Sequence, residues 1–335
     1  MRVKKYKKLK NLEGYLQKKA QKKYRNPGRE GSEFSRNLGL LKHLGRNPRR
    51  MARSENQYPV VQQQRVTVQN HHGEKLVGIM HETGSTEIVI VCHGFRSSKD
   101  RIPMTNLAVA IEKEGISAFR FDFAGNGESE GVFQYGNYHR ETDDLRAVVQ
   151  YFLGEKRSIA AIVGHSKGGN VVLLYASMYI DVCNVVNISG RFDLKRGIEG
   201  RLGKGFLERI KQHGFIDVKN RRGKVEYRVT EESLMDRLTT DTHAACLSIP
   251  HSCRVLTVHS SMDEMVPVED AKEFAKYISN TKLHIIEGAD HEYTKHQDEL
   301  ASIVLNFLAV NPHEDKDMPM QFASCTREKK FHSRF

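Results

Sequence analysis

A serine enclosed by glycines carries the clearest chemical signal in this 335-residue sequence. Residues 163–169 read VGHSKGG; the mostly apolar run SIAAI precedes them, and the stretch that follows has helical apolar spacing. Gly164 and Gly168 lie two positions on either side of Ser166, as a nucleophile elbow between a strand and a helix requires. Such a turn is too tight for flanking side chains. We therefore predict that Ser166 is a nucleophile; the alternative is a glycine-rich turn without chemistry.

A serine hydroxyl needs a general base, and the base needs an orienting acid. His291 lies in EGADHEY, just after the last expected strand, and Asp263 lies in HSSMDEMVP, just after the preceding one. The order Ser166, Asp263, His291 is the order used with this type of elbow. Glu264 is the second choice for the acid. Three further residues suit these roles less well, because they lie within a strand, at a helix start and in a turn: His284, His296 and Asp290.

Acyl transfer also needs two N–H donors for the oxyanion of the intermediate. One is expected from the backbone of Lys167, the residue after the nucleophile, and the other from the loop after the third strand. That loop contains Gly94, which permits a turn, followed by Phe95. We predict that the backbone amides of Phe95 and Lys167 form the oxyanion hole.

Strand-like and helix-like stretches alternate from residue 63 to about residue 310. This rhythm predicts an α/β fold with a mostly parallel sheet covered by helices on both faces. The first two strands, joined by NHHGE, should form an antiparallel hairpin at one edge. The expected strands are 64–69, 75–82, 87–93, 116–123, 158–165, 182–189, 254–260 and 282–288, and the expected helices are 104–114, 138–153, 168–179, 269–279 and 296–309.

Residues 191–250 interrupt this rhythm and are too long for a simple connection. They carry 13 basic and 9 acidic residues and include a hairpin signal around RRGKVEYRVT, at 221–230. We predict a cap over the active site, whose basic character favours an anionic or phenolic substrate.

The N-terminal region differs sharply from the rest in charge. Residues 1–53 hold 18 of the 53 Lys and Arg residues but 3 of the 41 acidic ones, a net charge of +15, whereas the remainder has 35 basic and 38 acidic residues. We expect residues 1–62 to form a basic, disordered extension that contacts an anionic membrane surface or nucleic acid, and residues 311–335 to form a disordered tail.

Five motifs in order resemble the α/β-hydrolase superfamily: CHGFRSSKD (92–100), RFDFAGNGESEG (120–131), GHSKGG (164–169), HSSMDEMVP (259–267) and GADHEY (288–293). Over residues 63–310 the chain is most similar to the serine aminopeptidase-type and feruloyl or cinnamoyl esterase-like branch, which includes many plant hydrolases. The resemblance implies an eight-stranded sheet with a cap after the sixth strand, and a purely structural turn at 122–129.

The predicted function is that of a serine hydrolase that cleaves carboxylic esters, including aryl or cinnamoyl esters, through an acyl-enzyme. Peptidase, thioesterase or acyltransferase activity would use the same residues, and a non-catalytic small-molecule receptor is a further alternative. The five scattered cysteines and the absence of Cys/His ligand spacings predict no metal, no cofactor and a reducing, cytoplasmic location, with a plastid as the alternative.

If the basic extension binds polyanions, its affinity should be electrostatic and sensitive to salt. The full chain should then bind anionic vesicles or single-stranded RNA at 50 mM salt and lose most of that affinity at 300 mM. A variant that lacks residues 1–53 serves as the control and should not bind. Equal binding by both proteins would contradict the assignment of binding to this extension.

Overall fold

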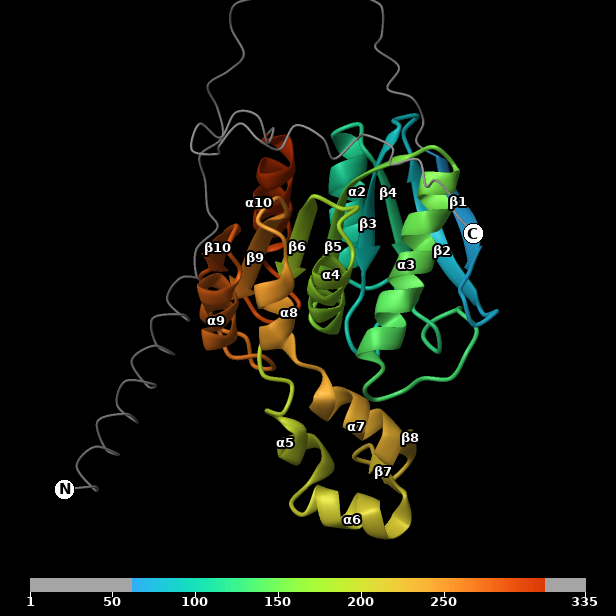
Figure 1. Ribbon diagram of the computed structural model, residues 1–335, viewed down its shortest axis with the longest axis vertical. Coiled ribbons are helices and arrows are strands. Elements are labelled where there is room, and N and C mark those ends of the chain that lie inside the picture. The colour runs from blue at the N-terminus through green and yellow to red at the C-terminus, as the bar shows by residue number, and fades with distance from the viewer. Residues whose placement is uncertain (1–61, 311–335) are drawn as a thin grey trace, which may run out of the picture. The chain divides into compact units, whose positions relative to one another are not determined.

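A computed structural model describes residues 62–310 of the chain. Its centre is an eight-stranded sheet (Figure 1). From one edge to the other its strands are β1 (Gln62–Gln69), β2 (Lys75–Glu82), β4 (Ser117–Phe121), β3 (Glu87–Cys92), β5 (Ser158–His165), β6 (Asn184–Ile188), β9 (Arg254–Ser260) and β10 (Thr281–Ile286). The predicted class and strand number are confirmed, and the ends of every expected strand fall within two residues of the observed ones.

The sheet is mixed at one edge and parallel elsewhere. β1 and β2 form the predicted antiparallel hairpin, and β2 also runs antiparallel to β4. From β4 to β10 all neighbouring strands are parallel. The carboxyl ends of these parallel strands therefore meet at one rim, where loops from distant parts of the sequence come together.

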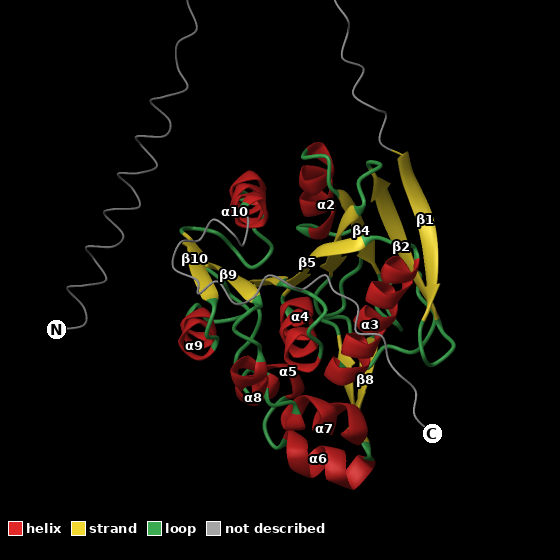
Figure 2. Cartoon of the chain, turned by 45° about the horizontal axis from the view of Figure 1, so that its top comes forward, coloured by secondary structure: helices red, strands yellow, loops and turns green. Residues whose placement is uncertain are grey.

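Helices cover both faces of the sheet (Figure 2). In β3, Ile88, Ile90 and Cys92 point to one apolar cluster, while Val89 and Val91 point to the other. A strand buried on both faces has this continuous apolar sequence. The first cluster lies under α3 (Tyr138–Gly154), α4 (Lys167–Met178), α8 (Thr242–Ser248) and α9 (Glu269–Tyr277), and the second lies under α2 (Met104–Lys113) and α10 (Gln297–Ala309).

A separate group of elements lies between β6 and β9, where a cap was predicted (Figure 1). It comprises α5 (Ile198–Leu202), α6 (Phe206–His213), β7 (Phe215–Lys219), β8 (Val225–Thr230) and α7 (Glu231–Thr239). The hairpin is present, but its first strand, β7, begins earlier than the sequence signal. The last helix of the interval, α8, packs on the main core through Cys246, so it belongs to the sheet layers.

The turn at 122–129 ties two of the five motifs together. Both carboxylate oxygens of the buried Asp122 accept hydrogen bonds from Lys99, one from its backbone N–H and one from Nζ at 2.9 Å. The backbone of Gly127 has a positive φ of 52°, and a Cβ there would lie 2.1 Å from Asp122. The Ser129 hydroxyl accepts from the N–H of Val77 in β2. These contacts give the turn a structural role.

The basic extension and the C-terminal tail predicted from the sequence lie outside residues 62–310, apart from residue 62 itself. Within this range, none of the helices combines the length and the apolar character that a membrane crossing needs.

Lys99 should be a major determinant of stability, because its side chain is 2% exposed and its ammonium group neutralises the fully buried Asp122. Lys99→Met leaves that carboxylate without its charge partner and should lower the free energy of unfolding by about 3 kcal/mol. Lys75→Met is the matched control, since Lys75 forms an exposed pair with Glu130 and should change stability by less than about 1 kcal/mol. Urea denaturation measures both, and equal effects would contradict this account.

Candidate active site

The Ser166 elbow forms where β5 meets α4. Ser166 has φ 55° and ψ −117°, a backbone conformation that side-chain-bearing residues rarely adopt. Its neighbours are packed against backbone: a Cβ on Gly164 would lie 2.1 Å from the carbonyl oxygen of Gly168. A Cβ on Gly168 would lie 2.6 Å from the carbonyl oxygens of Cys92 and His93. The glycines are therefore required by contact between β5, α4 and the end of β3.

Ser166, His291 and Asp263 are joined by a continuous chain of hydrogen bonds. His291 Nε2 lies 3.0 Å from Ser166 Oγ, and His291 Nδ1 lies 2.7 Å from Asp263 Oδ2. Because a carboxylate only accepts, Nδ1 carries the proton and donates to Asp263. In the neutral ring, Nε2 is then the acceptor for the serine hydroxyl. The three residues lie on loops after β5, β9 and β10.

The side chain of Asp263 is fully buried and is held as an anion. Its Oδ1 accepts from the backbone N–H groups of Met265 and Val266, at 2.8 and 2.7 Å, and its Oδ2 accepts from the Ser260 hydroxyl. Burial alone would raise the pKa of Asp263, but the hydrogen bond and charge of His291 and these N–H donors outweigh it. They lower the pKa to about 2, so Asp263 is ionised at neutral pH.

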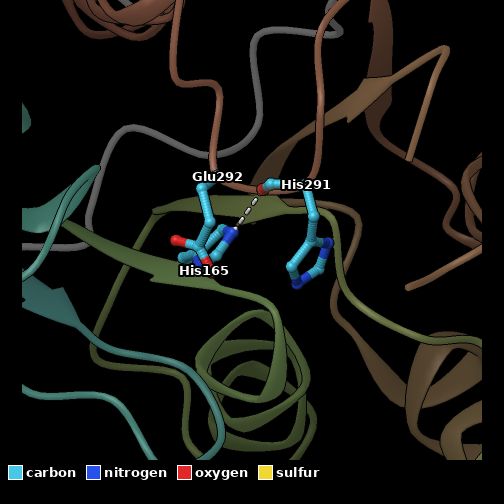
Figure 3. A group of neighbouring side chains, drawn as sticks. All are labelled: His165, His291 and Glu292. Carbon is cyan, nitrogen blue, oxygen red and sulfur yellow. Dashed lines mark hydrogen bonds between the residues drawn. The ribbon is translucent and has the colours of Figure 1, made fainter. Parts of the chain in front are cut away.

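Two further side chains fix the backbone of His291. His165 Nε2 donates to the His291 carbonyl oxygen at 2.9 Å, as the dashed line in Figure 3 shows. Glu264 Oε2 accepts from the His291 N–H at 3.3 Å. Glu264, the second choice for the orienting acid, thus contacts the backbone of the histidine, while Asp263 contacts its ring. No local sequence signal indicated a role for His165, since its partner lies 126 positions away.

His165, His291 and Glu292 bring three potential metal ligands within 4.8 Å of one another (Figure 3). Both ring nitrogens of His291 already take part in the hydrogen-bonded chain, and His165 Nε2 is protonated toward a carbonyl oxygen. Protonated ring nitrogens do not bind metals. The donor set therefore fits a hydrogen-bond network better than a metal centre.

The loop after β3 lies directly against Ser166. A Cβ on Gly94 would lie 3.0 Å from the Ser166 Cβ, so the loop approaches the serine as closely as a glycine allows. His93 holds this loop: its Nδ1 donates to the Gly94 carbonyl oxygen at 2.8 Å, and its Nε2 accepts from the N–H of Phe123 at 3.1 Å. Phe95 and Lys167 both line the cavity that contains Ser166, where oxyanion donors were expected.

Lys167, the residue after Ser166, is anchored by a buried ion pair. Lys167 Nζ donates to Glu141 Oε1 of α3 at 2.7 Å, and both side chains are 4% exposed. Burial raises the pKa of Glu141 to about 7, although the Lys167 charge opposes this shift. The pair links α3 to the first turn of α4 and thus helps to fix the backbone of Lys167.

The other titratable candidates lie apart from this network. His284 is exposed on β10, and His296 precedes α10. Asp290 accepts from the N–H of Thr294 at 2.7 Å, as expected of a turn residue.

The depressed pKa of Asp263 makes a pH-dependent contribution to stability. Between about pH 2 and 4 the unfolded chain binds more protons at this residue than the folded protein, so stability rises with pH across that window. The free energy of unfolding of the wild type should fall by about 2 kcal/mol more than that of Asp263→Asn between pH 5 and 2. Urea unfolding of both proteins at several pH values tests this, and parallel curves would contradict it.

Sequence comparison finds similarity to one protein family and to one yeast protein. The serine aminopeptidase S33 family matches residues 84–245. The Saccharomyces cerevisiae protein YDL057W is 26% identical over 238 residues, which cover 62% of this chain and 69% of the yeast protein.

Three solved structures share the fold. Est1E from Butyrivibrio proteoclasticus, solved with ferulic acid bound, is 24% identical with a TM-score of 0.63, covering 72% of this chain and 97% of its own. The α/β-hydrolase GrgF from a Penicillium species is 19% identical, with a TM-score of 0.64 and coverages of 74% and 98%. The Pyrococcus furiosus esterase Pf2001 is 24% identical, with a TM-score of 0.58 and coverages of 74% and 92%. These likenesses show that the chain has the α/β-hydrolase fold.

Proposed function

We propose that this protein is a serine hydrolase that cleaves carboxylic esters. The observation that carries the proposal is the hydrogen-bonded chain from Ser166 through His291 to the ionised Asp263. This arrangement converts a weakly nucleophilic hydroxyl into one that can attack a carbonyl carbon. A protein that only binds a ligand has no need of a strained serine aligned with a base.

The proposed reaction begins when Ser166 Oγ attacks the acyl carbon and its proton passes to His291 Nε2. The Phe95 and Lys167 amides stabilise the resulting oxyanion. The imidazolium then donates its proton to the alcohol oxygen, the C–O bond breaks, and an acyl-serine remains. Water loses a proton to His291 and attacks this intermediate, and proton return to Ser166 releases the carboxylic acid. Asp263 holds the imidazole in the required tautomer and stabilises its charged form.

An aryl or cinnamoyl ester is the proposed class of substrate. Two proteins of similar fold support this proposal. Pf2001 is described as an esterase, and Est1E was solved with ferulic acid, an aromatic acid. In this chain, the cavity beside Ser166 has a volume of about 260 Å³ and is lined by aromatic rings that could contact such a group, among them Phe95, Tyr135 and Tyr138.

The decisive test combines hydrolysis with covalent labelling. Wild-type protein should hydrolyse 4-nitrophenyl and cinnamoyl esters and form a fluorophosphonate adduct on the Ser166 peptide, identified by mass spectrometry. Ser166→Ala should abolish the adduct and lower kcat by about 10⁴-fold or more, because the covalent step is lost.

Ser302→Ala is the matched control, since this exposed serine of α10 only donates to the Asp298 carbonyl oxygen. It should react like the wild type. A wild-type protein that neither hydrolyses esters nor takes the label would support the receptor function instead.

A further inference from the structure

Three arginines from separate segments line the cavity that contains Ser166 and His291. Arg191 follows β6, Arg201 lies on α5, and Arg237 lies on α7. All three are partly buried. The cap and the segment leading into it thus bring three positive charges to the space where the ester must bind.

None of these three guanidinium groups pairs with a carboxylate among residues 62–310. Arg191 donates to the Met265 carbonyl oxygen, and Arg201 stacks 4.5 Å over the ring of Phe95. Arg237 donates to two neutral oxygens, the carbonyl of Leu194 at 2.9 Å and the hydroxyl of Tyr138 at 2.8 Å.

A fourth lining arginine shows the contrast. Arg196 forms ion pairs with Asp193 at 3.3 Å and with Asp270 at 3.5 Å, so its charge is already compensated. A charge that is partly removed from water is stabilised by an opposite charge nearby. Three unpaired ones in a single cavity therefore indicate that a ligand supplies the missing negative charge.

The electrostatics of Arg191 agree with this interpretation. Burial lowers its pKa, Asp270 and Tyr138 oppose that effect, and the charges of Arg237 and Arg201 lower it further. The three guanidinium groups therefore repel one another, and a bound anion would relieve the repulsion.

The cavity lining also contains two carboxylates, those of Glu264 and Glu292. Glu264 accepts from the His291 backbone N–H, and Glu292 is the next residue in the chain. They do not form ion pairs with the three arginines.

We propose that the substrate carries an oxyanion, a carboxylate or a phosphate, which is bound by Arg191, Arg201 and Arg237 while its ester lies at Ser166. Guanidinium groups bind such anions through paired N–H donors. Because the cavity is small, the anion and the ester must be close together in the molecule. This inference rests on the proposed function, because it concerns the substrate of the same site.

The first test compares esters that differ only in charge. One pair places the anion on the acyl side, mono-4-nitrophenyl glutarate against 4-nitrophenyl methyl glutarate. The other places it on the alcohol side, 4-acetoxybenzoate against its methyl ester. In at least one pair, kcat/KM should be about 10 to 100-fold higher for the anionic ester, as expected for charge-assisted hydrogen bonds. No preference in either pair, or a preference for the neutral esters, would overturn the proposal.

Substitution of the arginines separates a specific site from general attraction. Arg201→Gln and Arg237→Gln should each lower the preference for the anionic ester about 10-fold. Arg222→Gln is the matched control, since it removes the same charge from the exposed turn of the cap hairpin, outside the cavity lining. It should keep the wild-type preference, and an equal loss in all three variants would contradict the assignment.

A binding measurement separates this proposal from the proposed function. Ser166→Ala cannot form an acyl-enzyme but should still bind glutarate or ethyl phosphate in a calorimeter, and the stronger of the two identifies the anion. Adding Arg201→Gln to Ser166→Ala should weaken that binding about 10-fold. Ester hydrolysis without anion binding would refute only the arginine site, whereas anion binding without hydrolysis or fluorophosphonate labelling would refute only the esterase assignment.

Discussion

Close backbone packing between β5, α4 and the end of β3 is the constraint on which the site depends. At Gly164 and Gly168 the chain segments approach so closely that a single methyl group would overlap a carbonyl oxygen. This contact forces Ser166 into its positive-φ conformation at the carboxyl rim of the sheet. The position of the serine in turn determines where a base, an acid and two amides must lie. Packing of the surrounding sheet and helices offsets the free-energy cost of the strained backbone at Ser166.

The loops around Ser166 are held by hydrogen bonds and ion pairs, and most of the charged side chains in them have a partner. Asp263 is ionised because N–H groups and an imidazole surround it, and His291 is fixed at its ring, its backbone N–H and its carbonyl oxygen. The Lys167–Glu141 pair anchors the first residue of α4 from the other side. Each of these groups has its partner within the main domain. The cavity arginines differ because Arg191, Arg201 and Arg237 form no ion pair with a carboxylate of residues 62–310, and we propose that a ligand supplies the opposite charge.

Local patterns predicted most of the fold and the positions of the proposed triad. Buried strands have continuous apolar sequences and amphipathic helices have a regular period, so their boundaries could be read from the chain. The elbow was detectable because its steric requirement falls on neighbouring positions, Gly164 and Gly168. The bond from His165 to His291 joins residues 126 positions apart, and the convergence of Arg191, Arg201 and Arg237 depends on how the cap folds over the rim. Contacts of this kind leave no periodic or local signal. The strand β7 escaped detection for another reason, because its five residues show no alternation of buried and exposed positions.

The cap is a single continuous insertion between β6 and β9, and its elements supply two of the three unpaired cavity arginines. The residues proposed to make and break bonds, by contrast, lie on loops that follow strands of the sheet. If the proposed function holds, evolution could remodel this one stretch of the gene and so change which compound is bound. The reactive groups, which tolerate little displacement, would be inherited unchanged.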